Sequence, residues 1–356
     1  MNSFRGLSER QAEIASKRVV VGFDGFIDTI VRPVRRSATA EAPALMFDTI
    51  REFGEFLTGC AEKSCSIELK VEARQLGGNL PFLSRSAGRL GLDVTCVGML
   101  GENGTVAQPF REMPCRLYSF AAPGESTCLE FRDGKVFLAS DCTLSEDPWQ
   151  MVLRATEGGA AELFRSADLI ALVNWSELSF SHRLWAAVFS ESLDGGVEEK
   201  AKFAFFDLCD CSRKTNEEIE EVLRLIGLFS RRRTAILSVN ENEAHVIGAR
   251  VLGCGSEPTQ IAAALREKYG IDEIMVHTLR KSLLATPRGV TLQSTDFIEH
   301  PKISTGAGDN LNGALCFGTL MGMTDEERVR FANRYASFYV SHGYSPTLSE
   351  LISSGA

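Results

Sequence analysis

Short apolar runs, each ending in small or polar residues, recur along the chain with room for a helix between them. A β-branched run followed by a glycine is typical of a buried parallel strand, which is covered on both faces. Helical patterns at 80–90, 216–228 and 258–268 separate several of these runs. We therefore predict buried strands at 19–21, 94–99, 169–173, 203–206, 235–239 and 274–276.

Strands that alternate with helices favour an α/β fold, a parallel sheet with helices on both faces. Sites in such sheets lie at the carboxyl ends of the strands. Two stretches depart from the alternation, 29–36 and 116–139. The second contains Asp133-Gly134 between two apolar runs, which is a strong hairpin signal. We expect both stretches to form a small accessory sheet.

Composition excludes several classes of protein. The net charge of −9, from 38 basic and 47 acidic residues, disfavours a nucleic-acid partner. The five histidines form no close pair, and the ten cysteines form no Cys-x-x-Cys, so reduced thiols are expected. Residues 1–18 show no apolar signal core, and 313–323 is too short to span a membrane. We predict a cytoplasmic protein without a membrane partner, and expect the arginine run 231–233 to be a solvated loop.

The strongest chemical signal is Gly306-Ala307-Gly308-Asp309, which precedes an apolar helix rich in small residues. The glycines allow a sharp turn whose N–H groups point outward at a helix N-terminus, which suits a phosphate. Asp309 would stand beside it, ionised, in the first helical turn. A plain helix cap explains Asp309 equally well at this point.

Competing phosphate motifs fit less well. The chain contains no P-loop, and a dinucleotide motif would need a third glycine where Leu311 stands. Thr324 to Glu327 reads as a capping box that starts a helix.

Further polar segments follow the predicted strands: Asp24 and Asp28 after the first, Asn240 and Glu243 after the fifth, and Gly77-Gly78-Asn79 before a helix. Together with Asp309, these segments resemble the ribokinase/PfkB family of carbohydrate kinases. The resemblance extends from residue 19 to about residue 346, with the motifs in the family's order.

The resemblance implies a three-layer α/β/α domain with a mostly parallel sheet and a small β lid over the acceptor. Residues 1–356 would form this single domain, with 29–36 and 116–139 as lid segments. It also implies ATP as phosphoryl donor, Mg²⁺ as cofactor, and a monovalent cation as a further candidate cofactor. The exposed lid edge predicts a homodimer, although other family members are monomers.

The resemblance also suggests roles for individual residues. Asp309 would be the catalytic base, and the N–H groups of Gly306, Ala307 and Gly308 would stabilise the transferring phosphoryl group. The residues expected to bind the acceptor are Asp24, Asp28, Gly77, Gly78 and Asn79.

The nucleotide side is expected to include Asn240, Glu243, Thr278 and Arg280. Glu243 would contact Mg²⁺, directly or through water, although a helix cap explains Asn240 and Glu243 equally well. At Thr278-Leu279-Arg280 the family's glycine is missing, and Arg280 itself is a candidate phosphate contact. Asp207 resembles the family's strand-end aspartate, for which a structural role is as plausible as a functional one.

The function predicted is transfer of the γ-phosphoryl group of ATP to a hydroxyl, preferably a hydroxymethyl, of a sugar or sugar-like acceptor. A nucleoside kinase is an alternative, with Phe26, Phe82 and Trp175 as stacking surfaces. A catalytically silent sugar-binding regulator is another, and a dinucleotide-dependent dehydrogenase comes last. The identity of the acceptor and of its reacting hydroxyl stays open.

Overall fold

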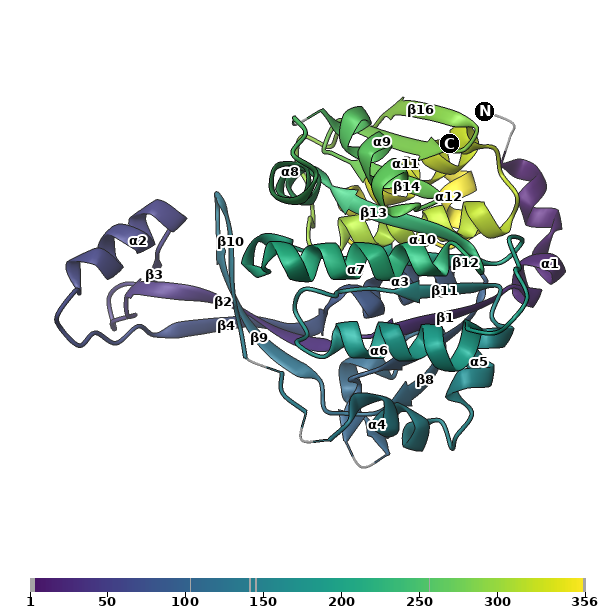
Figure 1. Ribbon diagram of the computed structural model, residues 1–356. Coiled ribbons are helices and arrows are strands. Elements are labelled where there is room, and N and C mark those ends of the chain that lie inside the picture. Colours follow the sequence, from purple (N-terminus) through teal and green to yellow (C-terminus); the bar gives the residue numbers. More distant parts are fainter. Residues whose placement is uncertain (1–3, 103, 141, 145, 256, 355–356) are drawn as a thin grey trace.

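A nine-stranded sheet crosses the middle of the molecule (Figure 1). The computed structural model describes residues 4–102, 104–140, 142–144, 146–255 and 257–354, so the start of the polar segment 1–18 and both ends of the expected 1–356 domain lie outside it. The strand order is β16-β15-β14-β13-β12-β11-β1-β5-β8. From β14 to β8 all neighbours are parallel, and β15 and β16 are antiparallel.

All six predicted strands belong to this sheet. They are β1 (Arg18–Phe23), β5 (Asp93–Gly98), β11 (Leu169–Leu172), β12 (Phe203–Asp207), β13 (Thr234–Asn240) and β14 (Glu273–His277). The sheet is completed by β8 (Arg116–Ser119), β15 (Lys281–Thr286) and β16 (Gly289–Ser294).

Helices cover both faces of the sheet, because successive strand residues point to opposite sides. Val20 packs into one core, whereas Val19 and Val21 pack into the other. The first face carries α4 (Pro148–Ala155), α5 (Ala160–Ser166), α6 (Ser181–Val188), α7 (Asn216–Phe229), α8 (Glu241–Ile247) and α9 (Pro258–Tyr269). The second carries α1 (Gln11–Ser16), α3 (Asn79–Arg89), α10 (Ala307–Leu320), α11 (Asp325–His342) and α12 (Leu348–Ser353). The predicted three-layer α/β/α fold is confirmed.

Helix boundaries follow local sequence chemistry. The three helices predicted at 80–90, 216–228 and 258–268 are α3, α7 and α9. The expected capping box at Thr324 and Glu327 begins α11, and a second one at Thr215 and Glu218 begins α7. Among the described residues, no helix is both long enough and apolar enough to cross a membrane.

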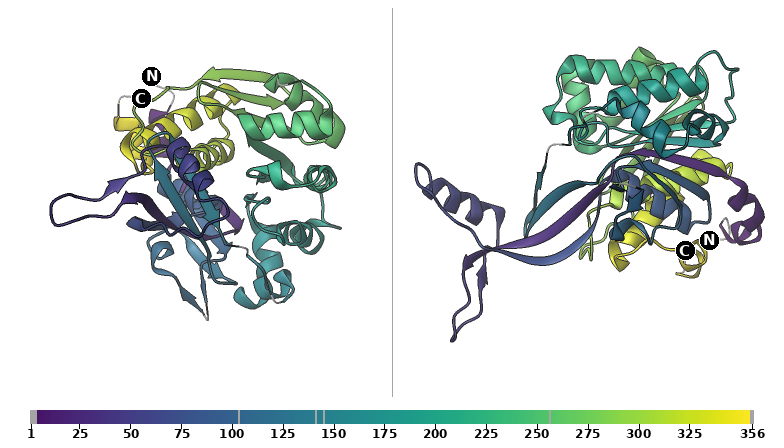
Figure 2. Two further views of the ribbon diagram at one scale, coloured as in Figure 1. Left: turned by 90° about the vertical axis from the view of Figure 1, so that its left-hand side faces the viewer. Right: turned by 90° about the horizontal axis from the view of Figure 1, so that it is seen from below.

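A second sheet leaves the body at one side and projects into solvent (Figures 1 and 2). It consists of β2 (Phe26–Arg36), β3 (Leu45–Met46), β4 (Leu69–Gly77), β9 (Gly124–Phe131) and β10 (Gly134–Ala139), and we call it the lid sheet. The hairpin predicted around Asp133-Gly134 is confirmed as β9 and β10, in which Phe131 pairs with Gly134.

One expected boundary is wrong. The stretch 116–139 was expected to lie in the accessory sheet, but its first residues form β8, which pairs with β5 in the main sheet. The physical reason is that Leu117 and Tyr118 pack against the cores on opposite faces of the main sheet.

The far end of the lid sheet carries an arm that the sequence patterns did not predict. This lid arm, residues 37–68, includes α2 (Ile50–Gly59), which Figure 1 shows far from the main sheet. Phe47 and Phe53 from the arm pack with Val31, Leu129 and Phe131 of the lid sheet in a small separate core. A further two-stranded ribbon joins β6 (Gly101–Glu102) to β7 (Thr105–Val106).

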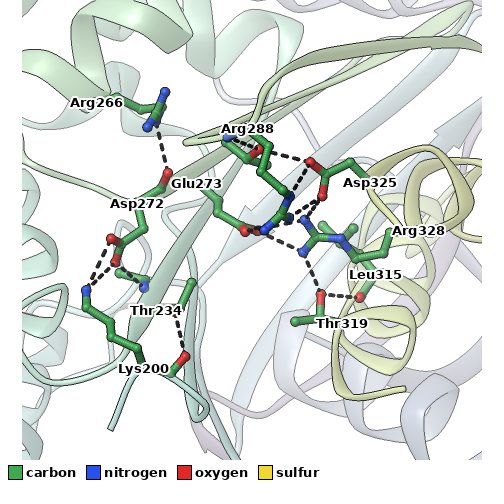
Figure 3. Close-up of polar contacts among 12 residues, drawn as sticks. Lys200, Thr234, Arg266, Asp272, Glu273, Arg288, Leu315, Thr319, Asp325 and Arg328 are labelled. Atoms are coloured by element: carbon green, nitrogen blue, oxygen red, sulfur yellow. Dashed lines mark hydrogen bonds and ion pairs between the residues drawn. The ribbon is translucent and has the colours of Figure 1, made fainter. Parts of the chain in front are cut away.

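A buried ionic network fastens α11 to the amino end of β14 (Figure 3). Arg328 donates to Glu273 at 2.8 Å, and both side chains are less than 5% exposed. Asp325 accepts from Arg328 and Arg288 and from the Thr286 hydroxyl. Burial alone would raise the pKa of Asp325, but these hydrogen bonds lower it to about 2.

The expectation of a solvated arginine run is wrong for Arg233, which is fully buried. Its guanidinium donates to the carbonyl oxygens of Phe164, Arg165 and Ala167, at the C-terminal end of α5. An arginine is suited to this position because helix ends leave carbonyl groups without intrahelical partners.

Candidate active site

Asp309 lies in the first turn of α10, near the carboxyl ends of the central strands. Gly306 precedes the helix with a φ of 82°, in the left-handed region that favours glycine. A Cβ at this position would lie only 2.8 Å from the Phe82 ring of α3. The sharp turn predicted from the glycines therefore exists, and it is packed tightly against α3.

The position of α10 is set by Asn312, one turn after Asp309. Asn312 Nδ2 donates to Asp207 Oδ2 at 2.7 Å, and Asn312 Oδ1 accepts from Ser238 Oγ at 2.7 Å. Because Asp207 ends β12 and Ser238 lies on β13, this buried amide ties the helix to two neighbouring strands.

The carboxyl group of Asp309 is surrounded by other carboxyl groups. Burial raises its pKa well above the usual value, and the charges of Asp207, Asp24 and Glu243 raise it further. The N-terminus of α10 favours the ionised form of Asp309, whereas burial and the three like charges favour the protonated form. That Asp309 is ionised stays a prediction.

The amide groups of the glycine turn are not all available. The N–H of Ala307 donates to the Ser304 carbonyl at 3.2 Å, which differs from its expected place in the anion hole. The His277 ring, at the end of β14, lies 3.4 Å from where a Gly308 Cβ would be. Burial lowers the pKa of His277 to about 4, so this ring is neutral at physiological pH.

Asp28 and Gly77 lie directly against each other. Asp28 is on β2 and Gly77 ends β4, and a Cβ at Gly77 would come within 2.2 Å of Asp28 Oδ1. That same oxygen accepts from Ser126 Oγ of β9 at 2.5 Å. Burial raises the pKa of Asp28, while the Ser126 hydrogen bond and the charge of Lys135 oppose the rise. The acceptor-side residues thus meet where the lid sheet joins the body.

Asp24 is engaged in holding α3. It is fully buried, and its carboxylate accepts from the backbone N–H groups of Asn79 and Leu80 at 2.7 and 2.8 Å. The Asn174 amide donates to it at 2.7 Å, and a Cβ at Gly78 would collide with it at 2.2 Å. These contacts make Asp24 the cap of α3 and occupy the oxygens that were expected to meet the acceptor.

Asn79 connects the acceptor turn to the strand ends. Its side chain hydrogen bonds with Asp207 and lowers the pKa of that carboxyl, while burial raises it to about 6 overall. The structure therefore brings Asn79 and Asp207 together, a contact that was not predicted from the sequence.

Asn240 and Glu243 form a reciprocal capping box at the start of α8. Asn240 N–H and Nδ2 donate to the two Glu243 oxygens at 2.9 and 2.6 Å, and Glu243 N–H donates to Asn240 Oδ1 at 2.9 Å. The helix-cap interpretation is confirmed. Burial, with the charges of Asp207 and Asp210, raises the pKa of Glu243 to about 8.

A cavity of about 820 Å³ opens beside the glycine turn. It is bordered by Thr278, Leu279, Phe297, Leu311, Ala307 and Gly308, with Asn240 at its α8 side. The Arg280 guanidinium lies 4.4 Å from the centre of the Phe297 ring, at the rim of this cavity. The Thr278 hydroxyl accepts from the N–H of Arg280 and of Lys281, so it shapes the turn.

Four polar residues near the site were not predicted: Ser126, Lys135, Asn174 and Asn312. Asn312 follows Asp309 by three residues, and Lys135 follows the Asp-Gly turn directly, so both positions carried a signal. Asn174 directly follows the predicted strand 169–173, so it also carried a signal, whereas Ser126 carried none because it reaches the site only through the pairing of β2 with β9.

Comparisons with known proteins agree with this geometry. A curated ketohexokinase of Haloferax volcanii is 25% identical over 342 residues, which cover 94% of this chain and 89% of that protein. Among solved structures, Arabidopsis thaliana ribokinase complexed with ribose and ATP has a TM-score of 0.60 at 19% identity, covering 95% of this chain and 98% of its own. Escherichia coli phosphofructokinase-2 has a TM-score of 0.66 at 11% identity, with 95% and 97% covered.

These solved structures confirm the ribokinase-like fold. The family described as prokaryotic ketohexokinase matches residues 5–354, nearly the whole chain. The chain therefore belongs to the prokaryotic ketohexokinase family, and it is a sugar kinase, a phosphotransferase with an alcohol group as acceptor.

Proposed function

We propose that the protein transfers the γ-phosphoryl group of ATP to a hydroxymethyl group of a ketohexose, in the cytoplasm. The observation that carries this proposal is the arrangement of the site in a chain of this family. Asp309 and the Gly306 turn lie beside the segments that carry the acceptor-side residues Asp24 and Asp28. The similar ribokinase structure holds ribose and ATP, which supports ATP as donor and a small sugar as acceptor.

On the acceptor side, Asp28 binds sugar hydroxyls through the carboxylate that packs against Gly77. Gly78 and Asn79 complete the turn, and Asp24 contributes by fixing the start of α3. Ser126 orients Asp28 through their 2.5 Å hydrogen bond. The charged partner is the Asp28 carboxylate. Hydrogen bonds that the sugar hydroxyls and Ser126 donate to it are stronger than hydrogen bonds between neutral groups.

In the reaction, the acceptor oxygen forms a bond to the γ-phosphorus as the bond to the β,γ-bridging oxygen breaks. The hydroxyl proton passes to Asp309, and ADP leaves with the bridging oxygen. The Gly306 and Gly308 amides donate to the transferring group, whose transition state needs positioning and charge stabilisation above all. Burial and the charges of Asp207, Asp24 and Glu243 raise the pKa of Asp309, which makes its carboxylate a better acceptor for the hydroxyl proton.

On the donor side, ATP occupies the cavity bordered by Thr278 and Leu279, with Arg280 at its rim. Asn240 and Glu243 would hold Mg²⁺ on the triphosphate through water, and the cation would supply charge stabilisation to the transferring group. Among the described residues no three acidic, histidine or cysteine side chains gather closely enough to hold a metal ion. A monovalent cation stays a prediction.

The direct test measures ADP release with a panel of ketohexoses, aldohexoses, pentoses and nucleosides. We expect ketohexoses to give the highest kcat/KM. Phe26, Phe82 and Trp175, the surfaces considered for stacking a nucleoside base, are all less than 7% exposed, so nucleosides should be poor acceptors. A sugar that binds without any ADP release would instead indicate a silent regulator.

Replacing Asp28 with alanine tests the acceptor site. A lost charged hydrogen bond corresponds to an increase of about 10- to 100-fold in the ketohexose KM. The KM for ATP should stay within about twofold, because Asp28 lies on the lid sheet, away from the nucleotide cavity. Equal changes in both constants, or no change, would contradict the assignment.

The lid sheet is also the proposed contact between two copies of a single-domain protomer. Its edge strand β4 is exposed over most of its length, and Leu69, Val71, Phe137 and Leu138 are each more than 40% exposed. An unpaired strand edge with apolar side chains favours pairing with another chain. Sedimentation at several concentrations should show a homodimer, and a Val71→Lys variant should shift it to monomer.

A further inference from the structure

Thr305, the residue before Gly306, is contacted from two separate parts of the molecule. From α11, the Tyr339 hydroxyl donates to the Thr305 carbonyl oxygen at 2.8 Å. From the lid sheet, Lys135 Nζ donates to Thr305 Oγ1 at 3.3 Å. The residue is therefore bound to the body through its backbone and to the lid sheet through its side chain.

The Tyr339 contact is the fixed end of this arrangement. The side chain is 2% exposed, and its helix packs along α10. Burial raises the pKa of Tyr339 to about 12, so the hydroxyl keeps its proton and acts as a donor. The charge of Asp309 also raises this pKa, which shows that the ring lies close to the proposed base.

The Lys135 contact belongs to the same face of the lid sheet as Asp28. Lys135 is paired across the hairpin with Glu130 at 3.1 Å, and its charge lowers the pKa of Asp28. Its neighbouring strand β9 carries Ser126, which holds Asp28. Lys135 and the acceptor-binding carboxylate are thus parts of one hydrogen-bonded sheet.

We propose that Thr305 couples the lid sheet to the phosphate-binding turn, so that the turn reaches its working geometry when the lid sheet covers the acceptor. Tyr339 and Thr305 are positioning residues in this scheme, and the inference rests on the proposed kinase function. The expected effect is on kcat, because a displacement of about 1 Å in a group aligned for reaction can cost about 100-fold in rate.

The first test compares two tyrosines of α11. Tyr335 lies one turn before Tyr339, and its buried hydroxyl donates to the carbonyl oxygens of Ser86 and Pro346, away from Thr305. We expect Tyr335→Phe and Tyr339→Phe to lower the thermal midpoint alike. Only Tyr339→Phe should lower kcat, by about 10-fold, a net loss typical of a hydrogen bond of about 1.5 kcal/mol, with the ketohexose KM within about twofold. Equal kcat values for the two variants would overturn the positioning role of Tyr339.

The second test is a double-mutant cycle with Lys135→Met and Thr305→Val, measured as kcat at saturating substrates. If the two side chains act through one contact, Thr305→Val loses about 10-fold and the double variant is no slower than Lys135→Met alone. Thr305→Ser, which keeps the hydroxyl, should restore most of the rate. Losses that multiply, or a fully active Thr305→Val, would overturn the coupling. A wild-type protein inactive on every acceptor would refute the proposed function, whereas an active wild type with unaffected variants would refute the coupling alone.

Discussion

Among the described residues, acidic side chains are buried at both ends of the main sheet, but only those at the amino end have cationic partners. At the amino end, Glu273 and Asp325 are paired with Arg328 and Arg288 (Figure 3). At the carboxyl end, Asp24, Asp207 and Glu243 accept hydrogen bonds from amides. Burial raises the pKa values of these three and of Asp309, and nearby carboxyl charges add to the rise for Asp24, Glu243 and Asp309.

The difference separates a structural use of charge from a functional one. A buried pair that satisfies both members holds two elements in register, and breaking it leaves an uncompensated charge. A group of buried carboxyl groups without cations weakens the folded state, because burial and like charges oppose ionisation. Perturbed pKa values of this kind gather at functional sites.

The largest effect expected is on activity, from Asp309→Asn at the carboxyl end. Asparagine can still cap the helix but cannot accept the hydroxyl proton, so kcat should fall by about 100- to 10,000-fold. The thermal midpoint should be unchanged or higher, because the variant removes a charge that Asp207 and Asp24 oppose. Steady-state kinetics and thermal unfolding of the same preparation check both points. A stable and fully active variant would refute the proposed mechanism.

At the amino end, Arg328→Met should affect stability and leave the chemistry intact. Glu273 loses its buried cation, for which the expected cost is about 3–5 kcal/mol in the free energy of unfolding. Arg330→Met is the matched control on the same helix, because its partner Glu326 is exposed and such pairs contribute less than about 1 kcal/mol. Urea unfolding measures both variants. Equal losses in the free energy of unfolding, or a changed kcat in the folded Arg328→Met protein, would contradict a purely structural role for the charges at the amino end.

The smallest effect expected is in the pH dependence of stability. The raised pKa of about 6 means that folded Asp207 binds its proton more tightly than the unfolded chain does, so its contribution is lost as pH rises from about 4 to 6. Asp325, with its pKa lowered to about 2, acts in the opposite sense and loses its contribution as pH falls below about 4. The thermal midpoint of Asp207→Asn relative to wild type should therefore rise between pH 4 and 8. Parallel curves would contradict the raised pKa of Asp207, which comes from its burial.

The main sheet could be predicted because its strands are buried on both faces and read as short apolar runs between helices. Strands β15, β16 and β4 were not predicted. The edge strand β16 and the lid strand β4 are largely exposed and carry no such run, whereas β15 is buried but follows β14 without a helix between them. Asp309 lies in the first turn of α10, as the glycine motif predicted, and Asp28 packs against Gly77, while their roles stay predictions. The capping role of Glu243 follows from its local spacing to Asn240. The role of Asp24 depends on contacts with distant segments, such as Asn174, that local spacing does not encode.

Strand β2 connects the acceptor-side residue Asp28 directly to the lid arm. Asp28 is the third residue of this eleven-residue strand, whose far end continues directly into the lid arm. Because Asp28 lies near one end of the strand, a small rotation of β2 about Asp28 would displace the lid arm much further than it displaces Asp28. Cys65, an exposed thiol on that arm, offers a natural attachment point for a reporter dye that would read sugar occupancy from outside the catalytic centre.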